Sequence, residues 1–220
     1  RHPRGELMAF QFGPRRGRYI EVTDATRGQA PALPPQELEH FESFDLIYRS
    51  LCAVLFNYVP LSGHPGGSIS SGRFVAGLLF DAMDYDVSRP DRDDADLVSY
   101  AAGHKALGLY AMWALRNELL RAGAPDLLAH DERHQLRLED LLGFRRNPSS
   151  RTPLFLKFRS KALDGHPTPI APFIRLSTGA SGVGLSASLG LAFGARDYYG
   201  AGAPRVHIVE GEGGMTPGRV

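Results

Sequence analysis

The sequence predicts an α/β fold with a parallel sheet and helices on both of its faces, incomplete at the C-terminus. Segments with apolar residues at helical spacing alternate with short apolar segments, and glycine-rich loops lie between them. This alternation is typical of a parallel sheet covered by helices. A parallel strand needs a connection of about a dozen residues to reach its neighbour. Because the last strand candidate, 205–209, is followed by few residues, we expect the sheet to be unfinished in this chain.

The individual elements follow from the spacing of the apolar residues. The predicted helices cover residues 44–58, 74–83, 107–120 and 185–195, and the predicted strands cover 96–100 and 205–209. Pro60 ends the first helix, because proline cannot continue helical hydrogen bonding. The stretch 124–170 is more polar, and we expect it to hold at most two short helices.

The chain is predicted to consist of an arm followed by one domain. Residues 1–40 are rich in Arg, Gly and Pro and have little apolar periodicity, which predicts an extended N-terminal arm. Residues 41–220 contain all the predicted helices and strands and are expected to form a single domain.

Composition excludes several classes of function. The net charge of +1 argues against nucleic acid or an anionic membrane as the main partner, since both favour dense basic patches. No apolar run approaches the roughly 18 residues of a membrane span. The single cysteine, Cys52, cannot form an internal disulfide, which favours a reducing, cytoplasmic location.

Three histidines share one sequence context. His64, His104 and His166 each follow a glycine, and the first and third also precede a proline. A Gly-His-Pro sequence interrupts regular helix and central strand, so the imidazole is presented from a loop. Imidazole can donate or accept a hydrogen bond near neutral pH, which suits sugar hydroxyls and phosphates. Each histidine alone could be a turn residue bonded to nearby backbone, but three similar loops favour a shared site.

Two glycine-rich segments complete the candidate site. Residues 179–184 open a helix, where backbone N–H groups and the helix dipole favour an anion. Their order is neither the dinucleotide-binding pattern nor a P-loop, and tight helix–sheet packing is the alternative. Gly211-Glu212-Gly213 follows the last strand, and its carboxylate could bind Mg²⁺ or Ca²⁺. A tight turn with a solvated glutamate is the alternative there.

His130 and His134 are one helical turn apart, which is a spacing that can bind a metal, but no third ligand is near them in the sequence. We therefore interpret them as part of a solvated helix face.

Taken together, five segments resemble the amino-terminal domain of the transketolase family, in the family's order and over roughly residues 43–219. They are Ser62-Gly63-His64-Pro65-Gly66, Gly103-His104, Gly165-His166-Pro167, Ser177 to Gly184, and Gly211-Glu212-Gly213. The resemblance implies the thiamine-diphosphate-binding fold, with residues 41–220 as a truncated part of the diphosphate-binding domain. It also implies roles for single residues.

By this resemblance, His64 and His166 are the catalytic residues that line the channel and bond the sugar substrate. The implied cofactor-binding residues are His104, Gly179, Ser181, Gly211, Glu212 and Gly213. Glu212 is also the implied ligand of the Mg²⁺ or Ca²⁺ that bridges the two phosphates. Glu212 stands where the family has Asp, which adds one methylene group to the metal ligand.

The resemblance implies a transketolase-like transferase that moves a two-carbon ketol unit between sugar phosphates with thiamine diphosphate and a divalent metal. We expect a homo-oligomer, and a complementary chain or continuation that carries the pyrimidine-binding domain. Two alternatives remain open. Pro217 replaces a family Glu, and residues 214–218 are similar to deoxyxylulose-phosphate synthases, another thiamine-diphosphate carboligase. The second alternative is a non-catalytic protein that keeps the fold only for assembly, since Glu212 and Pro217 both differ from the family's residues. The sequence does not identify the donor or acceptor sugar.

Overall fold

The computed structural model describes residues 33–59, 65–145, 152–169, 171–179 and 182–216. The chain divides into two units, residues 1–39 and residues 40–220, and the elements that build the site belong to the second unit. No helix in the described part is both long enough and apolar enough to cross a membrane.

The long helices confirm the prediction from apolar spacing. They are α2 (Pro35–Tyr58), α3 (Pro65–Gly77), α4 (Ala106–Gly123) and α6 (Val183–Tyr199), with a short α5 (Pro153–Phe158) between the last two. Helix α2 begins earlier than predicted, so residues 35–40 of the expected extended arm are helical. Pro35 suits the first helical position and Glu37 favours the N-terminal dipole, which explains the earlier start. The predicted domain boundary near residue 40 stays a prediction.

Helix α3 also begins earlier than its apolar spacing suggested. It starts at Pro65, inside the Ser62 to Gly66 segment, where the Gly-His-Pro sequence predicts a loop. A proline at the first helical position lacks only an N–H that would have no helical partner anyway. At its other end α3 continues into a π-helical turn, η1 (Leu78–Ala82). The start of α3 therefore lies in the same segment as the predicted site.

The sheet consists, among the described residues, of two parallel strands. Strand β1 (Leu97–Tyr100) pairs with β2 (Val206–Val209), and Leu97 lies opposite Val206. Both predicted strands are thus confirmed to within one residue at their starts, and the parallel arrangement is confirmed.

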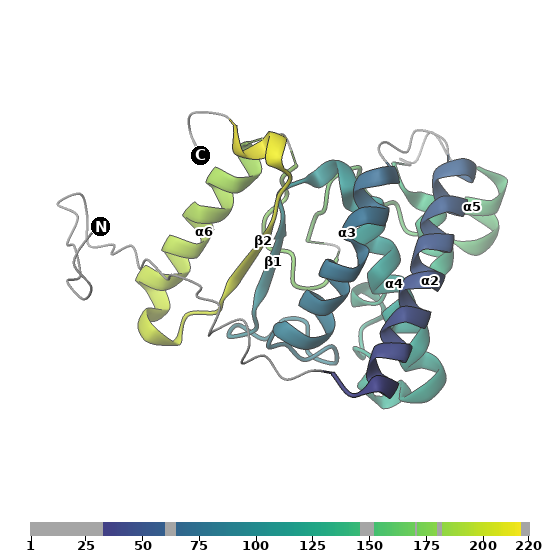
Figure 1. Ribbon diagram of the computed structural model, residues 1–220, viewed down its shortest axis with the longest axis horizontal. Coiled ribbons are helices and arrows are strands. Elements are labelled where there is room, and N and C mark those ends of the chain that lie inside the picture. The colour runs from purple at the N-terminus through teal and green to yellow at the C-terminus, as the bar shows by residue number, and fades with distance from the viewer. Residues whose placement is uncertain (1–32, 60–64, 146–151, 170, 180–181, 217–220) are drawn as a thin grey trace. The chain divides into compact units, whose positions relative to one another are not determined.

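Helices cover both faces of this sheet, as predicted. All four residues of β1 are buried. Val98 and Tyr100 belong to the main hydrophobic core, whereas Ser99 faces the other side, where its Oγ lies 2.5 Å from Ser188 Oγ of α6. Figure 1 shows α6 on one side of the strands and α3 and α4 on the other. The α/β fold predicted from the sequence is therefore present in this chain.

The amino ends of the two strands are joined by a buried carboxylate. Asp96 accepts hydrogen bonds from the backbone N–H groups of Asp84 and Arg205, each at 3.0 Å. It also forms an ion pair with the Arg205 guanidinium at 2.7 Å and a hydrogen bond with His207 Nε2 at 3.1 Å. A buried charge is tolerated only when it is paired and hydrogen-bonded, and Asp96 meets both conditions.

The polar stretch 124–170 contains, in the part that the structure describes, α5 and three short 3₁₀ helices. These are η3 (Pro125–Leu127), η4 (Glu132–His134) and η5 (Leu138–Gly143). We predicted at most two short helices here. Among the described residues this is correct for α-helices, and it is wrong when the three 3₁₀ helices are included. Local side-chain hydrogen bonds, such as the Asp131 carboxylate accepting from the Arg133 N–H, stabilise such turns without apolar periodicity.

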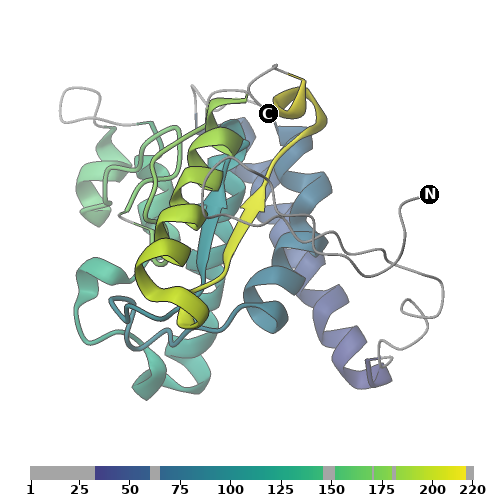
Figure 2. The same ribbon diagram turned by 90° about the vertical axis from the view of Figure 1, so that its left-hand side faces the viewer.

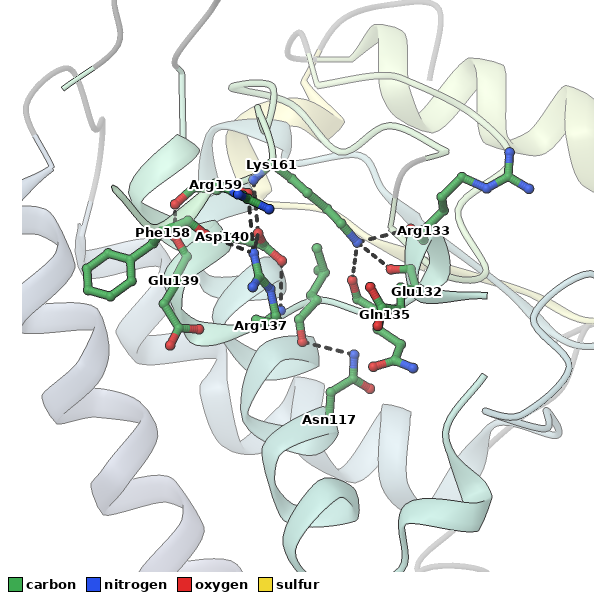
Figure 3. Close-up of polar contacts among 12 residues, drawn as sticks. Asn117, Glu132, Arg133, Gln135, Arg137, Glu139, Asp140, Phe158, Arg159 and Lys161 are labelled. Atoms are coloured by element: carbon green, nitrogen blue, oxygen red, sulfur yellow. Dashed lines mark hydrogen bonds and ion pairs between the residues drawn. The ribbon is translucent and has the colours of Figure 1, made fainter. Parts of the chain in front are cut away.

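A polar network fixes this stretch to the rest of the domain (Figure 3). The buried Asp140 carboxylate accepts from the backbone N–H groups of Arg137 and Lys161, each at 2.9 Å. The Lys161 ammonium donates to three backbone carbonyls, those of Glu132, Arg133 and Gln135. Residues 159–163 are consequently held against residues 132–140.

The same network connects to α4 and continues toward the predicted site. The Asn117 amide of α4 donates to the Leu136 carbonyl at 3.1 Å. Beyond the network, the Leu163 N–H donates to the Gly143 carbonyl at 3.0 Å, and the Arg145 N–H donates to the Leu163 carbonyl at 2.7 Å. These bonds hold Leu163 in the domain, three residues before the third predicted histidine, His166.

Candidate functional site

The predicted site residues that the structure describes lie around the carboxyl edge of the sheet. Figure 1 shows the carboxyl ends of β1 and β2 at the same edge as the first turns of α3 and α6. Figure 2 shows that edge from the side of α6, with α6 in front of both strands. In open α/β sheets ligands bind beyond the carboxyl ends of the strands, where loops and helix N-termini converge.

Three of the predicted motifs are in direct contact. A methyl group placed on Gly103, just after β1, would lie 2.6 Å from His166 Cδ2 and 2.7 Å from the Thr178 carbonyl oxygen. A methyl group on Gly179 would lie 2.7 Å from Gly103 Cα and 2.8 Å from His166 Cγ. These distances are too short for any side chain beyond hydrogen, so both positions require glycine. The second and third Gly-His loops and the glycine-rich segment thus form one cluster.

His166 is held in this cluster by its backbone. The Tyr110 hydroxyl of α4 donates to the His166 carbonyl at 3.0 Å. Burial raises the pKa of Tyr110, so this hydroxyl stays protonated and available as a donor. The His166 side chain remains exposed, and one edge of its ring lies against the two glycines. A ring that is fixed by its backbone and open to solvent can contact a ligand.

The start of α3 meets the loop that follows β1. The Ser68 hydroxyl donates to the Lys105 carbonyl at 3.3 Å, and the Tyr48 hydroxyl of α2 donates to the Ser68 carbonyl at 2.9 Å. Lys105 is the last residue of a 3₁₀ turn, η2 (Gly103–Lys105), that also contains His104. Its side chain runs along Gly67, where an added methyl group would lie 2.8 Å from Lys105 Cε. The start of α3, which follows the first predicted loop in the sequence, is therefore adjacent to the second predicted loop.

The loop after β2 contains two glutamates, Glu210 and Glu212, with different surroundings. Glu212 lies in the 3₁₀ turn η7 (Glu212–Met215) and is exposed. The neighbouring Glu210 accepts a hydrogen bond from the Gly211 N–H at 2.8 Å, and its carboxylate lies against Gly214. A methyl group on Gly211 would lie 3.9 Å from Lys105 Nζ, which connects this loop to the one after β1.

The structure thus brings together many of the predicted site residues. Gly179 and His166 touch each other, His104 lies in the turn between Gly103 and Lys105, and Gly211 lies beside Lys105. Glu212 and Gly213 lie on the exposed turn that follows β2. His64 and Ser181 fall outside the described residues. Their contacts with the cluster, and the specific role of each site residue, stay predictions.

Sequence reasoning did not single out Thr178, Lys105 or Glu210, which the structure places in the same cluster. Each is next to a predicted residue: Thr178 precedes Gly179, Lys105 follows His104, and Glu210 precedes Gly211. Adjacent residues can point in different directions, so their position in the sequence does not assign them to the site.

Unpaired polar atoms in this cluster fit an anionic ligand with a cation. Among the described residues, the buried Thr178 Oγ1 and Glu210 Oε2 atoms have no hydrogen-bond partner. A buried polar atom without a partner costs about 1–3 kcal/mol, so a ligand that bonded these atoms would be favoured. The described part contains no group of three His, Cys, Asp or Glu side chains placed to hold a metal. A metal here would need ligands from the bound phosphates or from other residues.

Comparison with known proteins relates the chain to the transketolases. The human protein named Transketolase is 30% identical over 159 residues, which are 72% of this chain and 21% of that protein. One polypeptide of the apulose-4-phosphate transketolase of Phocaeicola vulgatus, named as a subunit of that enzyme, is 26% identical over 167 residues, 74% of this chain and 47% of its own. The solved structure of transketolase from Leishmania mexicana matches 81% of this chain and 24% of its own, with 26% identity and a TM-score of 0.57. No family model matches the chain.

The chain spans about a fifth of the length of the transketolases that it matches and about half of the subunit-type relative. It resembles a second solved transketolase, from Pichia stipitis, in fold, with a TM-score of 0.56 at 22% identity.

Proposed function

From its relationship to the transketolases, which the sequence and structure matches establish, we propose that this chain is the diphosphate-binding part of a transketolase-like enzyme. The enzyme would transfer a two-carbon ketol unit between sugar phosphates, with thiamine diphosphate and Mg²⁺ or Ca²⁺. The observation that supports this most directly is the contact of Gly103, His166 and Gly179 at the carboxyl edge of the sheet. Segments far apart in the sequence meet there, each from a motif that resembles the family.

The residues of the cluster suit the binding of such a cofactor. Backbone N–H groups at the starts of α3 and α6 and in the loop after β2 can bind phosphate oxygens, since glycines leave the backbone accessible. His104 would contact the diphosphate, Gly179 and Ser181 would hold the cofactor, and Gly211, Glu212 and Gly213 would bind the phosphates and their metal. When bound, thiamine diphosphate supplies the electron sink for breaking the ketose carbon–carbon bond.

The catalytic work of this chain would then be positioning and proton handling. His64 and His166 would hydrogen-bond the sugar hydroxyls and the carbonyl oxygen near the reacting carbon. An imidazole can donate to an oxygen that gains charge and accept from a hydroxyl that loses a proton. The Tyr110 hydrogen bond to the His166 backbone keeps that ring in place, and a group that is already oriented stabilises the transition state best.

A second polypeptide, or a longer form of this chain, belongs to the proposal. A relative that is named as a subunit of a transketolase shows that enzymes of this type can be assembled from separate chains. The complementary part would carry the domain that binds the pyrimidine ring of the cofactor. We further propose a cytoplasmic homo-oligomer of the complete enzyme.

Cofactor binding by the complete protein tests the proposal. Calorimetric titration with thiamine diphosphate is expected to show tight binding with Mg²⁺ or Ca²⁺ and much weaker binding with a chelator, because the metal offsets the phosphate charge. A matched experiment with thiamine, which lacks the phosphates, controls for binding of the ring alone. No detectable binding of thiamine diphosphate under any condition would refute the proposed function. Equal affinity with and without metal would refute the metal role of Glu212 alone.

A further inference from the structure

We propose that Lys105 is a phosphate-binding residue of this site, and that its ammonium group contacts the diphosphate of thiamine diphosphate. The inference rests on the proposed function, because it names a residue that binds the proposed cofactor. It goes beyond the five sequence motifs, none of which includes Lys105.

The stem of the Lys105 side chain is fixed between two elements of the site. Its backbone closes the η2 turn directly after β1, and its carbonyl accepts a hydrogen bond from Ser68 of α3 at 3.3 Å. Its carbon chain lies along Gly67, close enough that an added methyl group would come within 3.1 Å of Cγ, Cδ and Cε. The absence of a side chain at Gly67 therefore creates the space through which this lysine reaches the edge of the sheet.

The ammonium group ends beside the loop that follows β2. Lys105 Nζ lies 3.9 Å from a methyl group placed on Gly211, the residue that opens the Gly-Glu-Gly motif. This ammonium group makes no hydrogen bond or ion pair with any of the described residues. The other two lysines are already engaged, since Lys161 donates to backbone carbonyls and Lys157 lies over the Phe158 ring. Among the described residues, no carboxylate therefore pairs with the Lys105 ammonium group.

The surroundings of Lys105 favour a phosphate that carries a metal ion. Glu210 lies in the same loop, with Oε1 occupied by the Gly211 N–H and Oε2 buried without a partner among the described residues. A ligand that satisfies both groups brings negative charge to Lys105 and a cation or donor to Glu210. A diphosphate with its divalent cation brings both. An ammonium group is also a common phosphate ligand, acting as a point charge.

Calorimetric titration of the complete protein with thiamine diphosphate in the presence of Mg²⁺ tests the proposal. Lys105→Gln keeps much of the carbon stem against Gly67 and removes the charge, and we expect it to weaken binding about 10- to 100-fold. Lys105→Arg should restore most of the affinity, because the charge returns. Lys157→Gln is the matched control on α5 and should bind as the wild type does. The loss in Lys105→Gln should also shrink at high salt, which screens the charge.

Chemical labelling of the wild-type protein provides a test that needs no variant. The chain has only three lysines, so the extent of reductive methylation at each can be measured by mass spectrometry. Thiamine diphosphate with Mg²⁺ is expected to protect Lys105 and not Lys157, whereas thiamine should protect neither. Protection by a sugar phosphate alone would assign Lys105 to the substrate phosphate and overturn the cofactor assignment.

The outcomes separate this inference from the proposed function. If the wild-type protein binds thiamine diphosphate and Lys105→Gln binds it equally well, with no protection from labelling, Lys105 has no role in binding and the function stands. If the wild-type protein does not bind thiamine diphosphate, the proposed function itself is wrong.

Discussion

At the scale of single residues, the site depends on two glycines that no other residue can replace. Gly103 and Gly179 lie so close to each other and to the His166 ring that a side chain on either would collide with backbone atoms or with the imidazole. In contrast, Gly184 faces Ala101 at the end of β1, where an added methyl group would lie 2.8 Å from the alanine backbone and side chain. One glycine-rich segment therefore serves both proposed purposes: Gly179 belongs to the site, and Gly184 permits tight helix–sheet packing.

We predict that His166→Ala lowers turnover about ten- to a thousandfold and leaves the affinity for thiamine diphosphate nearly unchanged. If His166 bonds the sugar most strongly in the transition state, its loss removes an interaction of roughly 1.4–4 kcal/mol from catalysis and little from cofactor binding. Steady-state kinetics with a ketose phosphate donor, together with calorimetric titration of the cofactor, measure the two effects. His130→Ala, at an exposed position away from the cluster, is the matched control. Unchanged turnover in His166→Ala would make this histidine a structural turn residue.

At the scale of elements, the two ends of the strand pair differ in their chemistry. Their carboxyl ends open into the glycine-rich loops of the site, whereas their amino ends are joined by Asp96 and its partners Arg205 and His207. The contacts of Asp96 therefore stabilise the amino ends of the strands, and the carboxyl ends are left for the candidate site.

Asp96 makes the stability of the sheet depend on pH in the acidic range. Burial raises the pKa of this carboxyl group, but the hydrogen bonds from Asp84, Arg205 and His207 outweigh that effect and hold it below its ordinary value of 3.8. A carboxyl group with a depressed pKa stabilises the folded state above its unfolded pKa. That contribution is lost as the pH falls below 3.8 toward the folded pKa.

We therefore predict that Asp96→Asn lowers the free energy of unfolding by roughly 1–3 kcal/mol at pH 7, and that the difference from wild type shrinks below about pH 3.8. Urea unfolding of both proteins between pH 2 and pH 7 measures this. Asp93→Asn, at an exposed position nearby, should behave as the wild type at every pH. A constant difference between Asp96→Asn and wild type across the whole range would show that the charge of Asp96 is not what stabilises the sheet.

At the scale of the whole molecule, the chain corresponds to a part of its relatives. It spans 21% of human transketolase and 47% of the subunit-type relative. Under the proposed function, the described cluster would bind the phosphates and one side of the sugar, and the complementary part would hold the rest of the cofactor.

We predict that residues 1–220 alone do not catalyse ketol transfer, and that activity appears when the complementary part is present. Ketol transfer from a ketose phosphate to an aldose phosphate can be measured for residues 1–220, for the complementary part and for both together. Co-purification of the two parts is a control for assembly. Activity of residues 1–220 by themselves would contradict the need for a second part.

The sequence by itself predicted the class of fold, the order of the elements and most residues of the candidate site. Apolar spacing located α4, α6 and both strands, because each pattern reflects a local period that the sequence carries directly. The starts of α2 and α3 were missed, because a proline at the first helical position begins a helix without adding an apolar residue to the pattern. The Gly-His loops could be recognised because a histidine next to glycine, and in two cases next to proline, indicates a loop whatever the surrounding fold.

Only the tertiary structure decided which of these residues meet. Gly103 and Gly179 are 76 positions apart and touch because α6 packs on β1, and Lys105 lies between Gly67 and Gly211 because α3 and the end of β2 converge there. Nothing in the local pattern distinguishes Lys105 from the other lysines, or Glu210 from Glu212. Contacts of this kind depend on how helices and strands pack in three dimensions, and packing is determined by all the buried residues together rather than by any one segment.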